Sequence, residues 1–327
     1  MWKPEWKRPC LLVGVVACFS LLIPYASGQA YPVKPVRILV GYPAGGAADL
    51  TARTVAPKLS EHLGQPVIVE NRPGASGAIA AERVATSPAD GYTLLMMPDA
   101  ATIQRVLHAK LPYDLERDLT PVTLVAIGPY VLVVHPSTPA RNVKELIALA
   151  RKWAGKLNYG SAGIGSTAHL AGALFNLLAN VNLVHVPFKG GAESVVGAAS
   201  GQVEMTIASV TPAQPLVASG RLRPIAVTSA KRSSLMPTIP TLDESGLRGY
   251  DFVGWYGLLA PAGVSKDIIS RLSTTLAKAA NIPEINEAFN RQGRELQTTT
   301  PEQFAALIRR EIARNAKLVK LTGLRAE

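Results

Sequence analysis

The segment VRILVGYPAGGAAD (Val36–Asp49) joins a short β-branched run to a glycine-rich turn and the start of a helix. Val36–Val40 is predicted to be a buried parallel strand, because such strands are apolar on both faces. A Gly/Pro loop follows at residues 41–48, and Asp49 is expected to open an amphipathic helix that ends before Gly64. A strand that passes through a glycine turn into a helix is the building unit of α/β proteins.

The same alternation continues along the chain. Strands are predicted at residues 66–69, 92–97, 130–134, 181–187, 203–207, 222–228 and 252–259, and helices at residues 78–85, 142–153, 167–178, 192–199, 266–281 and 301–321. The first three strands form a βαβαβ unit, which begins a doubly wound sheet. The pattern restarts at residue 130, and residues 233–249 read as an irregular connector. We therefore expect the chain to cross between two lobes near residues 128–130 and to return near 249–252.

A second glycine-rich loop, Gly160–His169, repeats the design of the first loop in the other half of the chain. Each loop follows a predicted strand and opens a helix. The first turn of a helix carries unpaired N–H groups and the positive end of the helix dipole, so it binds anions without a charged side chain. If the halves face each other, two such termini point into one cleft. Glycine at position 46 is expected to permit a positive φ and close approach of a ligand.

The N-terminus has the pattern of a secretory signal peptide. A basic stretch with Lys3, Lys7 and Arg8 precedes the apolar run 11–23, and small residues follow. Cleavage is predicted near Ala30, with a cut after Gly28 as the alternative. An uncleaved membrane anchor would need about 20 apolar residues. A lipoprotein acylated at Cys18 is a further alternative, but a cut at Cys18 would leave the apolar residues 19–23 at the N-terminus of the mature chain. We therefore predict export to the periplasm.

Composition excludes several classes of protein. Both cysteines, Cys10 and Cys18, lie in the predicted signal peptide, so the mature chain can form no disulfide and no thiolate metal site. The net charge is +11, and removal of the first thirty residues, which carry a net +2, leaves +9. No basic stretch interleaved with aromatic residues and no nucleic-acid fold motif accompanies this charge. We expect a monomer with no cofactor, no metal and no nucleic acid partner, whose positive field attracts small anions.

Motifs that would indicate catalysis are incomplete or absent in this sequence. Gly163–Ala168 matches the dinucleotide pattern G-x-G-x-x-A, but no acidic residue occurs about 20 positions later, in residues 180–188. There is no G-x-S-x-G elbow, and the five histidines have no zinc-ligand spacing. An exported hydrolase or lyase on a similar two-lobed scaffold remains the alternative to a binding protein, and a positioned nucleophile, base or metal would distinguish it.

Seven motifs in register resemble the receptors of tripartite tricarboxylate transporters, the Bug-type periplasmic binding proteins. They are residues 42–49 with Arg53, 70–77, 88–95, 111–114, 160–163 with His169-Leu170, 186–191 and 222–228. The resemblance implies a two-lobed, Venus-flytrap α/β fold of the type II-like class, each lobe a sheet flanked by helices. It assigns residues 31–129 and 250–327 to lobe 1, and residues 130–249 to lobe 2.

The resemblance also implies a function and a site. The ligand would be a small mono-, di- or tricarboxylate, and the partner would be a two-component membrane permease. By position, the ligand contacts would be Tyr42, Gly45, Gly46 and Ala47 in lobe 1, and Gly165, Ser166, Thr167 and His169 in lobe 2. Asp49, Ser76 and Lys189 are further candidates, although an N-cap role explains Asp49 without any ligand. Because Thr206–Ser209 lacks the Asp or Asn that family members often carry there, the ligand is expected to lack an amine.

Overall fold

The computed structural model describes residues 1–3, 31–108 and 110–324 of the chain. It divides into a unit of residues 1–31 and a unit of residues 32–327. Residues 4–30 lie outside the described residues, and with them most of the predicted signal peptide, its cleavage near Ala30 and the lipoprotein alternative at Cys18. Among the helices of the described residues, none is both long enough and apolar enough to cross a bilayer.

The unit of residues 32–327 alternates strands and helices. The strands are β1 (Val36–Val40), β2 (Val67–Asn71), β3 (Thr93–Pro98), β4 (Leu119–Val134), β5 (Asn158–Ser161), β6 (Val184–Pro187), β7 (Met205–Ser209), β8 (Arg223–Val227), β9 (Val253–Pro261) and β10 (Glu295–Leu296). The α-helices are α1 (Ala47–Leu63), α2 (Ala78–Ala85), α3 (Ala100–Leu107), α4 (Val143–Lys152), α5 (Thr167–Ala179), α6 (Gly191–Ala199), α7 (Val210–Ala218), α8 (Lys266–Ala279), α9 (Pro283–Arg291) and α10 (Pro301–Thr322). A 3-10 turn, η1 (Ala75–Gly77), precedes α2.

The strands join in the order β2-β1-β3-β9-β4-β7-β5-β6, with β8 and β10 also paired to β4. β1 lies parallel to β2 and β3, which is the βαβαβ start that the sequence predicts. β5 similarly lies parallel to β6 and β7. The long strand β4 connects the two parts, since it pairs with β9 up to Pro129 and with β7 from Tyr130 onward. The pairing changes where the sequence predicts the first crossing.

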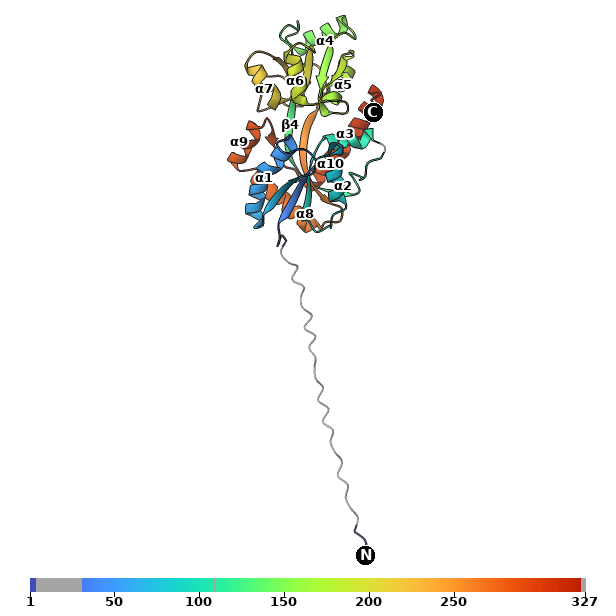
Figure 1. The fold of residues 1–327 in the computed structure, drawn as a ribbon, viewed down its shortest axis with the longest axis vertical. Coiled ribbons are helices and arrows are strands. Elements are labelled where there is room, and N and C mark those ends of the chain that lie inside the picture. The colour runs from blue at the N-terminus through green and yellow to red at the C-terminus, as the bar shows by residue number, and fades with distance from the viewer. Residues whose placement is uncertain (4–30, 109, 325–327) are drawn as a thin grey trace. The chain divides into compact units, whose positions relative to one another are not determined.

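Helices flank both parts of the sheet (Figure 1). Helices α4, α5, α6 and α7 surround the part that contains β5 to β8, which we call lobe 2, and α1, α2 and α8 lie against the other part, lobe 1. The core of lobe 1 is built around Trp255, Leu259 and Phe304, all fully buried. The end of α10 reaches lobe 2, because Leu318 packs in the same core cluster as Phe175 of α5.

The structure also corrects the element predictions. α3, α7 and α9 were not anticipated, and β4 begins at Leu119, eleven residues before the predicted strand at 130–134. These segments have mixed polarity, and packing on neighbouring elements determines their structure more than local pattern does. The predicted caps at Asn142 and Gly64 are confirmed: the Asn142 side chain accepts a bond from the N–H of Glu145, and Gly64 adopts φ 71°.

Close packing in lobe 1 leads to a stability prediction. A Cβ at Gly257 of β9 would lie 2.0 Å from the ring of Phe304, which is fully buried on α10. Overpacking of this kind costs about 1–3 kcal/mol. We therefore expect Gly257→Ala to lower the free energy of unfolding by that amount in denaturant titration. Gly190→Ala is the matched control, because a Cβ there meets no atom within 4 Å. Equal stability of the two variants would contradict the packing described here.

Candidate ligand-binding site

The first glycine loop forms a tight turn that ends at the N-terminus of α1. Gly45 adopts φ 78°, which favours glycine, and Gly46 is the N-cap with φ −72° and ψ 165°. The expectation of a positive φ at Gly46 was therefore wrong by one position. The N–H of Gly46 donates to the Pro43 carbonyl at 3.2 Å, which closes the turn.

The second loop repeats this geometry residue for residue. Gly165 adopts φ 71°, and Ser166 is the N-cap of α5 with φ −74° and ψ 158°. The N–H of Ser166 donates to the Gly163 carbonyl at 3.2 Å, as Gly46 does to Pro43. The two loops are thus structural equivalents, one in each lobe, and each presents the first turn of a helix.

The side chain four residues after each glycine holds the turn. The N–H of Gly45 donates to Asp49 Oδ2 at 2.8 Å, and the N–H of Gly165 donates to His169 Nδ1 at 3.1 Å. The predicted N-cap role of Asp49 is wrong, because α1 starts at Ala47 and Gly46 is its cap. Asp49 and His169 instead brace their loops from within the helix.

Asp49 is a buried, fully bonded carboxylate. Besides Gly45, it accepts bonds from Arg53 Nε at 2.9 Å and Asn71 Nδ2 at 2.8 Å. Burial alone would raise the pKa of Asp49, but the bonds from Arg53, Gly45 and Asn71 outweigh it and lower the pKa. Asp49 is therefore ionised at neutral pH, and its bonds serve the loop.

The N–H groups just inside each helix have no protein partner among the described residues. They belong to Ala47 and Ala48 in α1, and to Thr167 and Ala168 in α5, whereas the N–H of His169 donates to Ser166 Oγ at 3.2 Å. Ala47 is exposed. Such groups, at the positive end of a helix dipole, are donors suited to an anion.

Asp99 joins the two lobes at this site. It is the N-cap of α3 in lobe 1, is 6 % exposed, and its Oδ2 accepts a 2.8 Å bond from the Thr167 hydroxyl at the start of α5. Burial raises the pKa of Asp99 to about 6, although the Thr167 bond and the charge of Arg314 act in the opposite direction. This carboxyl group is not among the site residues predicted from the sequence.

Three tyrosines interact electrostatically with Asp99. Burial raises the pKa values of Tyr42, Tyr130 and Tyr256, and the charge of Asp99 raises each of them further. The Thr167 side chain acts in the opposite direction on the pKa of Tyr130. All three phenols stay neutral and can donate or accept hydrogen bonds. We call the hydroxyl groups of these tyrosines and the carboxyl group of Asp99 the hydroxyl-lined region.

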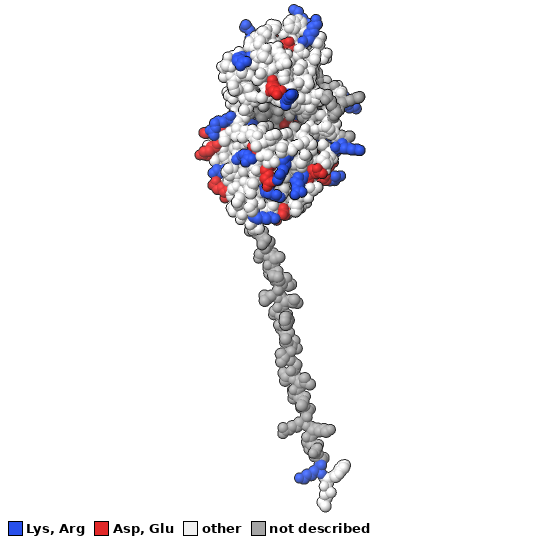
Figure 2. Space-filling model, in the orientation of Figure 1, with Lys and Arg blue, Asp and Glu red and all other residues white. Residues whose placement is uncertain are grey.

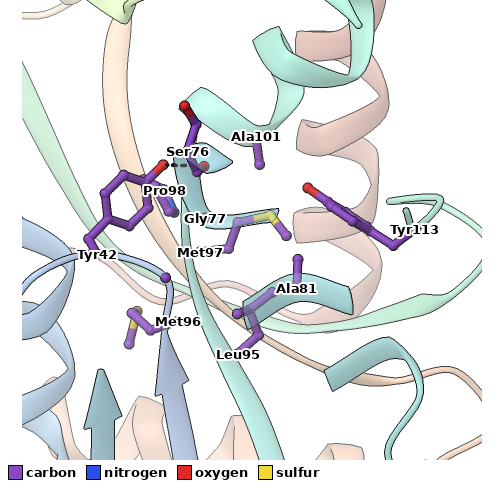
Figure 3. A pocket seen from close by; sticks show the side chains of 11 residues that line it. Tyr42, Ser76, Gly77, Ala81, Leu95, Met96, Met97, Pro98, Ala101 and Tyr113 are labelled. Carbon is purple, nitrogen blue, oxygen red and sulfur yellow. Dashed lines mark hydrogen bonds between the residues drawn. The ribbon is translucent and has the colours of Figure 1, made fainter. Parts of the chain in front are cut away.

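Tyr42 also closes a small cavity in lobe 1 (Figure 3). Its hydroxyl donates to the Ser76 carbonyl at 2.9 Å, and Met97 and Tyr113 lie farther along the wall. The cavity of about 10 Å³ is large enough for roughly one water molecule. Ala75 and Ser76 have positive φ values of 46° and 53°, a strained conformation of the kind that clusters at ligand sites.

The His169 ring lines a groove that includes none of these three tyrosines. It stacks on His185 with ring centroids 3.7 Å apart, and both rings line a groove with Leu321 at the end of α10. The pKa of each histidine is lowered to about 4, by burial for both rings and, for His169, also by the nearby His185. Both rings are therefore neutral at pH 7. Because His169 Nδ1 accepts from Gly165, the ring supports the loop.

The remaining candidate residues lie at the edges of the site. Ser76 is exposed, and only its backbone carbonyl is bonded to Tyr42. Lys189 is exposed, and its N–H donates to Glu193. Its neighbour Phe188 donates its N–H to the Ser161 carbonyl beside the second loop.

On the face shown in Figure 2, the surface is hollowed between the two lobes. Within the described residues, no cluster of His, Cys, Asp and Glu could hold a metal ion.

Comparison with known proteins identifies the family. The family model of the tripartite tricarboxylate transporter family receptor matches residues 51–324. This chain belongs to that family. It is 34 % identical to protein BugT of Bordetella pertussis, over 97 % of this chain and 98 % of BugT. The family consists of solute-binding receptors, so the predicted membership in the Bug-type receptors is confirmed.

Two solved structures of this type contain carboxylates. R. palustris Rpa4515 with adipate is 36 % identical, with a TM-score of 0.78 over 90 % of this chain and 99 % of that one. MatC from Rhodopseudomonas palustris with bound malate is 29 % identical, with a TM-score of 0.73 over 88 % and 100 % of the two chains. The predicted two-lobed α/β fold of periplasmic binding proteins is confirmed by these similarities.

Proposed function

We propose that this receptor captures a small carboxylate between the first turns of α1 and α5. The observation that carries the proposal is the pair of equivalent loops, one in each lobe, whose helices start with unbonded N–H groups. The Asp99–Thr167 bond joins the same two regions across the lobes. Adipate and malate, both dicarboxylates, in the related structures support a dicarboxylate as the ligand class.

The position of the two helix N-termini, one in each lobe, favours closure of the lobes around the ligand. A ligand that contacts both helix termini binds the closed arrangement better than the open one, and only such a difference can shift the population. Each terminus contributes about 0.3–2 kcal/mol to an anion, whereas micromolar affinity needs about 8 kcal/mol. The free backbone N–H groups of both first turns and the Tyr130 hydroxyl, with bridging water, supply the remainder in this proposal.

The receptor role also leads to proposals for the location, the oligomeric state and the partner of the chain. We infer that the chain acts in the periplasm as a monomer after cleavage near Ala30, and delivers its ligand to a two-component membrane permease. Lobe boundaries at residues 129/130 and 249/250 belong to this proposal, and the change of pairing along β4 supports the first of them. The proposal includes no catalytic step, because the matching family is a transporter receptor family.

A thermal-shift screen of small carboxylates tests the function. The panel should contain adipate, malate, succinate, citrate and benzoate, with glucose and an amide as neutral comparisons. A ligand at about 100 times its dissociation constant adds about 2.7 kcal/mol of stability, which is readily measured. No shift with any carboxylate would reject the proposal, and turnover of a bound carboxylate by the purified protein would favour the hydrolase or lyase alternative.

A further inference from the structure

Arg294 is a buried cation directly behind the first glycine loop. It follows α9 in the chain and is 5 % exposed. Its Nη1 donates to the Ala47 carbonyl at 2.6 Å and to Thr51 Oγ1 at 2.5 Å. Its guanidinium carbon lies 5.3 Å from the centre of the ring of Tyr256, one of the three tyrosines that interact electrostatically with Asp99. Arg294 therefore lies between the start of α1 and Tyr256 of the hydroxyl-lined region.

The charge of Arg294 is not balanced by a carboxylate. Among the ion pairs of the described residues, Arg53 pairs with Asp49 and Arg314 with Glu311, but Arg294 has no acidic partner. Burial lowers the pKa of Arg294, yet a guanidinium does not lose its proton in proteins. A buried cation without a counter-charge is costly. Its position at the positive end of the α1 dipole adds repulsion.

The donors of Arg294 are only partly used. A guanidinium has five N–H groups, and Nη1 uses its two on Ala47 and Thr51. For Nε and Nη2, no acceptor occurs in the part of the chain that the structure describes, and neither atom is among the fully enclosed unpaired atoms there. The cation thus has both charge and donors available next to the proposed site.

The bond to Ala47 links the cation to a free donor of the loop. The carbonyl of Ala47 and the N–H of Ala48 belong to one peptide group, so a cation on the carbonyl polarises that N–H. Hydrogen bonds in such a chain strengthen one another in the low-dielectric interior. The Ala48 N–H has no protein acceptor among the described residues.

From these contacts we infer that Arg294 is the counter-charge for the ligand carboxylate at the first loop and determines the preference for anions over neutral ligands. This inference rests on the proposed function. The guanidinium acts through space and through the Ala47–Ala48 peptide, so Arg294 is a positioning and specificity-determining residue. An anion at the N–H groups of Ala47 and Ala48 neutralises a charge that otherwise has no partner.

The test measures preference for charge, using a dicarboxylate and its diamide. In calorimetric titrations with adipate and adipamide, we expect Arg294→Met to reduce the adipate-to-adipamide affinity ratio at least tenfold. Arg294→Lys should retain most of the ratio, because it keeps the charge. Arg309→Met removes one exposed arginine of α10 and controls for net charge. The melting temperature of ligand-free Arg294→Met should not fall, since the variant removes an unpaired buried cation. If adipate is not bound by the wild type, malate with malamide replaces the pair.

The outcomes separate the inference from the function on which it rests. If Arg294→Met weakens both ligands equally and melts at a lower temperature, Arg294 only braces the loop and the inference is overturned. An unchanged ratio overturns it as well, while carboxylate binding by the wild type leaves the proposed function intact. Failure of the wild type to bind any carboxylate overturns both.

Discussion

Replacing Ala47 with Pro is expected to weaken carboxylate binding by about 10- to 100-fold while preserving the fold. Proline removes the N–H of Ala47, and a hydrogen bond to a charged group contributes about 1.5–3 kcal/mol, where about 1.4 kcal/mol is a tenfold change in affinity. Ala47 is the first residue of α1, a position that proline favours, and the backbone of Gly46 already has the extended conformation required before proline. The measurement is calorimetric titration with the carboxylate found in the screen.

Separate control variants test whether proline disturbs the fold and whether the changed side chain at position 47 matters. Proline already begins α9 and α10, at Pro283 and Pro301, so the chain accommodates it at this position. Ala47→Ser keeps the N–H and should bind almost normally, and Lys266→Pro makes the same backbone change at the start of α8. Wild-type affinity in a folded Ala47→Pro variant would show that the first turn of α1 does not bind the ligand.

Asp99→Asn should tighten dicarboxylate binding about tenfold at pH 8 and remove its pH dependence. The pKa of Asp99 is raised to about 6 in the free protein, and a bound anion nearby raises it further. Wild-type affinity should therefore increase as the pH falls from 8 to 6, while the ligand carboxylates stay ionised. Asparagine is neutral throughout and can still accept the Thr167 bond. Repulsion between two charges several ångströms apart in a protein is of the order of 1–4 kcal/mol, which sets the expected size.

One neighbouring group titrates in the same range and needs its own variant. Burial raises the pKa of Glu311 to about 7, and Glu311 is paired with Arg314 on α10. Glu311→Gln should leave most of the pH dependence of binding in place. Retention of the full dependence in Asp99→Asn, with its loss in Glu311→Gln, would assign the effect to Glu311 and reject the role of Asp99.

Local patterns made the scaffold predictable from the sequence. Each glycine loop carries its own turn, cap and helix start within ten residues, so the correspondence of Gly45–Ala47 with Gly165–Thr167 could be anticipated. The Asp49 prediction failed because its carboxylate reaches back to Gly45 and across to Asn71 of β2, a pairing that propensities do not encode.

Groups brought together by tertiary structure could not be predicted. Arg294 and Thr51 are 243 residues apart, and Asp99 and Thr167 are 68 apart. One signal for Asp99 was available, since it directly follows β3, and ligands in open α/β sheets bind beyond the carboxyl ends of strands. For Arg294 and His185 the sequence contains no comparable signal, because their roles depend on burial next to a loop.

The most direct measurement of the central claim compares a dicarboxylate with its diamide of the same shape, by calorimetric titration of the wild-type protein at pH 8. Two helix N-termini and a buried guanidinium that favour negative charge predict that the dicarboxylate binds at least about 100-fold more tightly, which corresponds to about 2.7 kcal/mol. Equal affinity for the dicarboxylate and the diamide would contradict the account, because the unbonded N–H groups of Ala47 and Thr167 would then not be recognising charge.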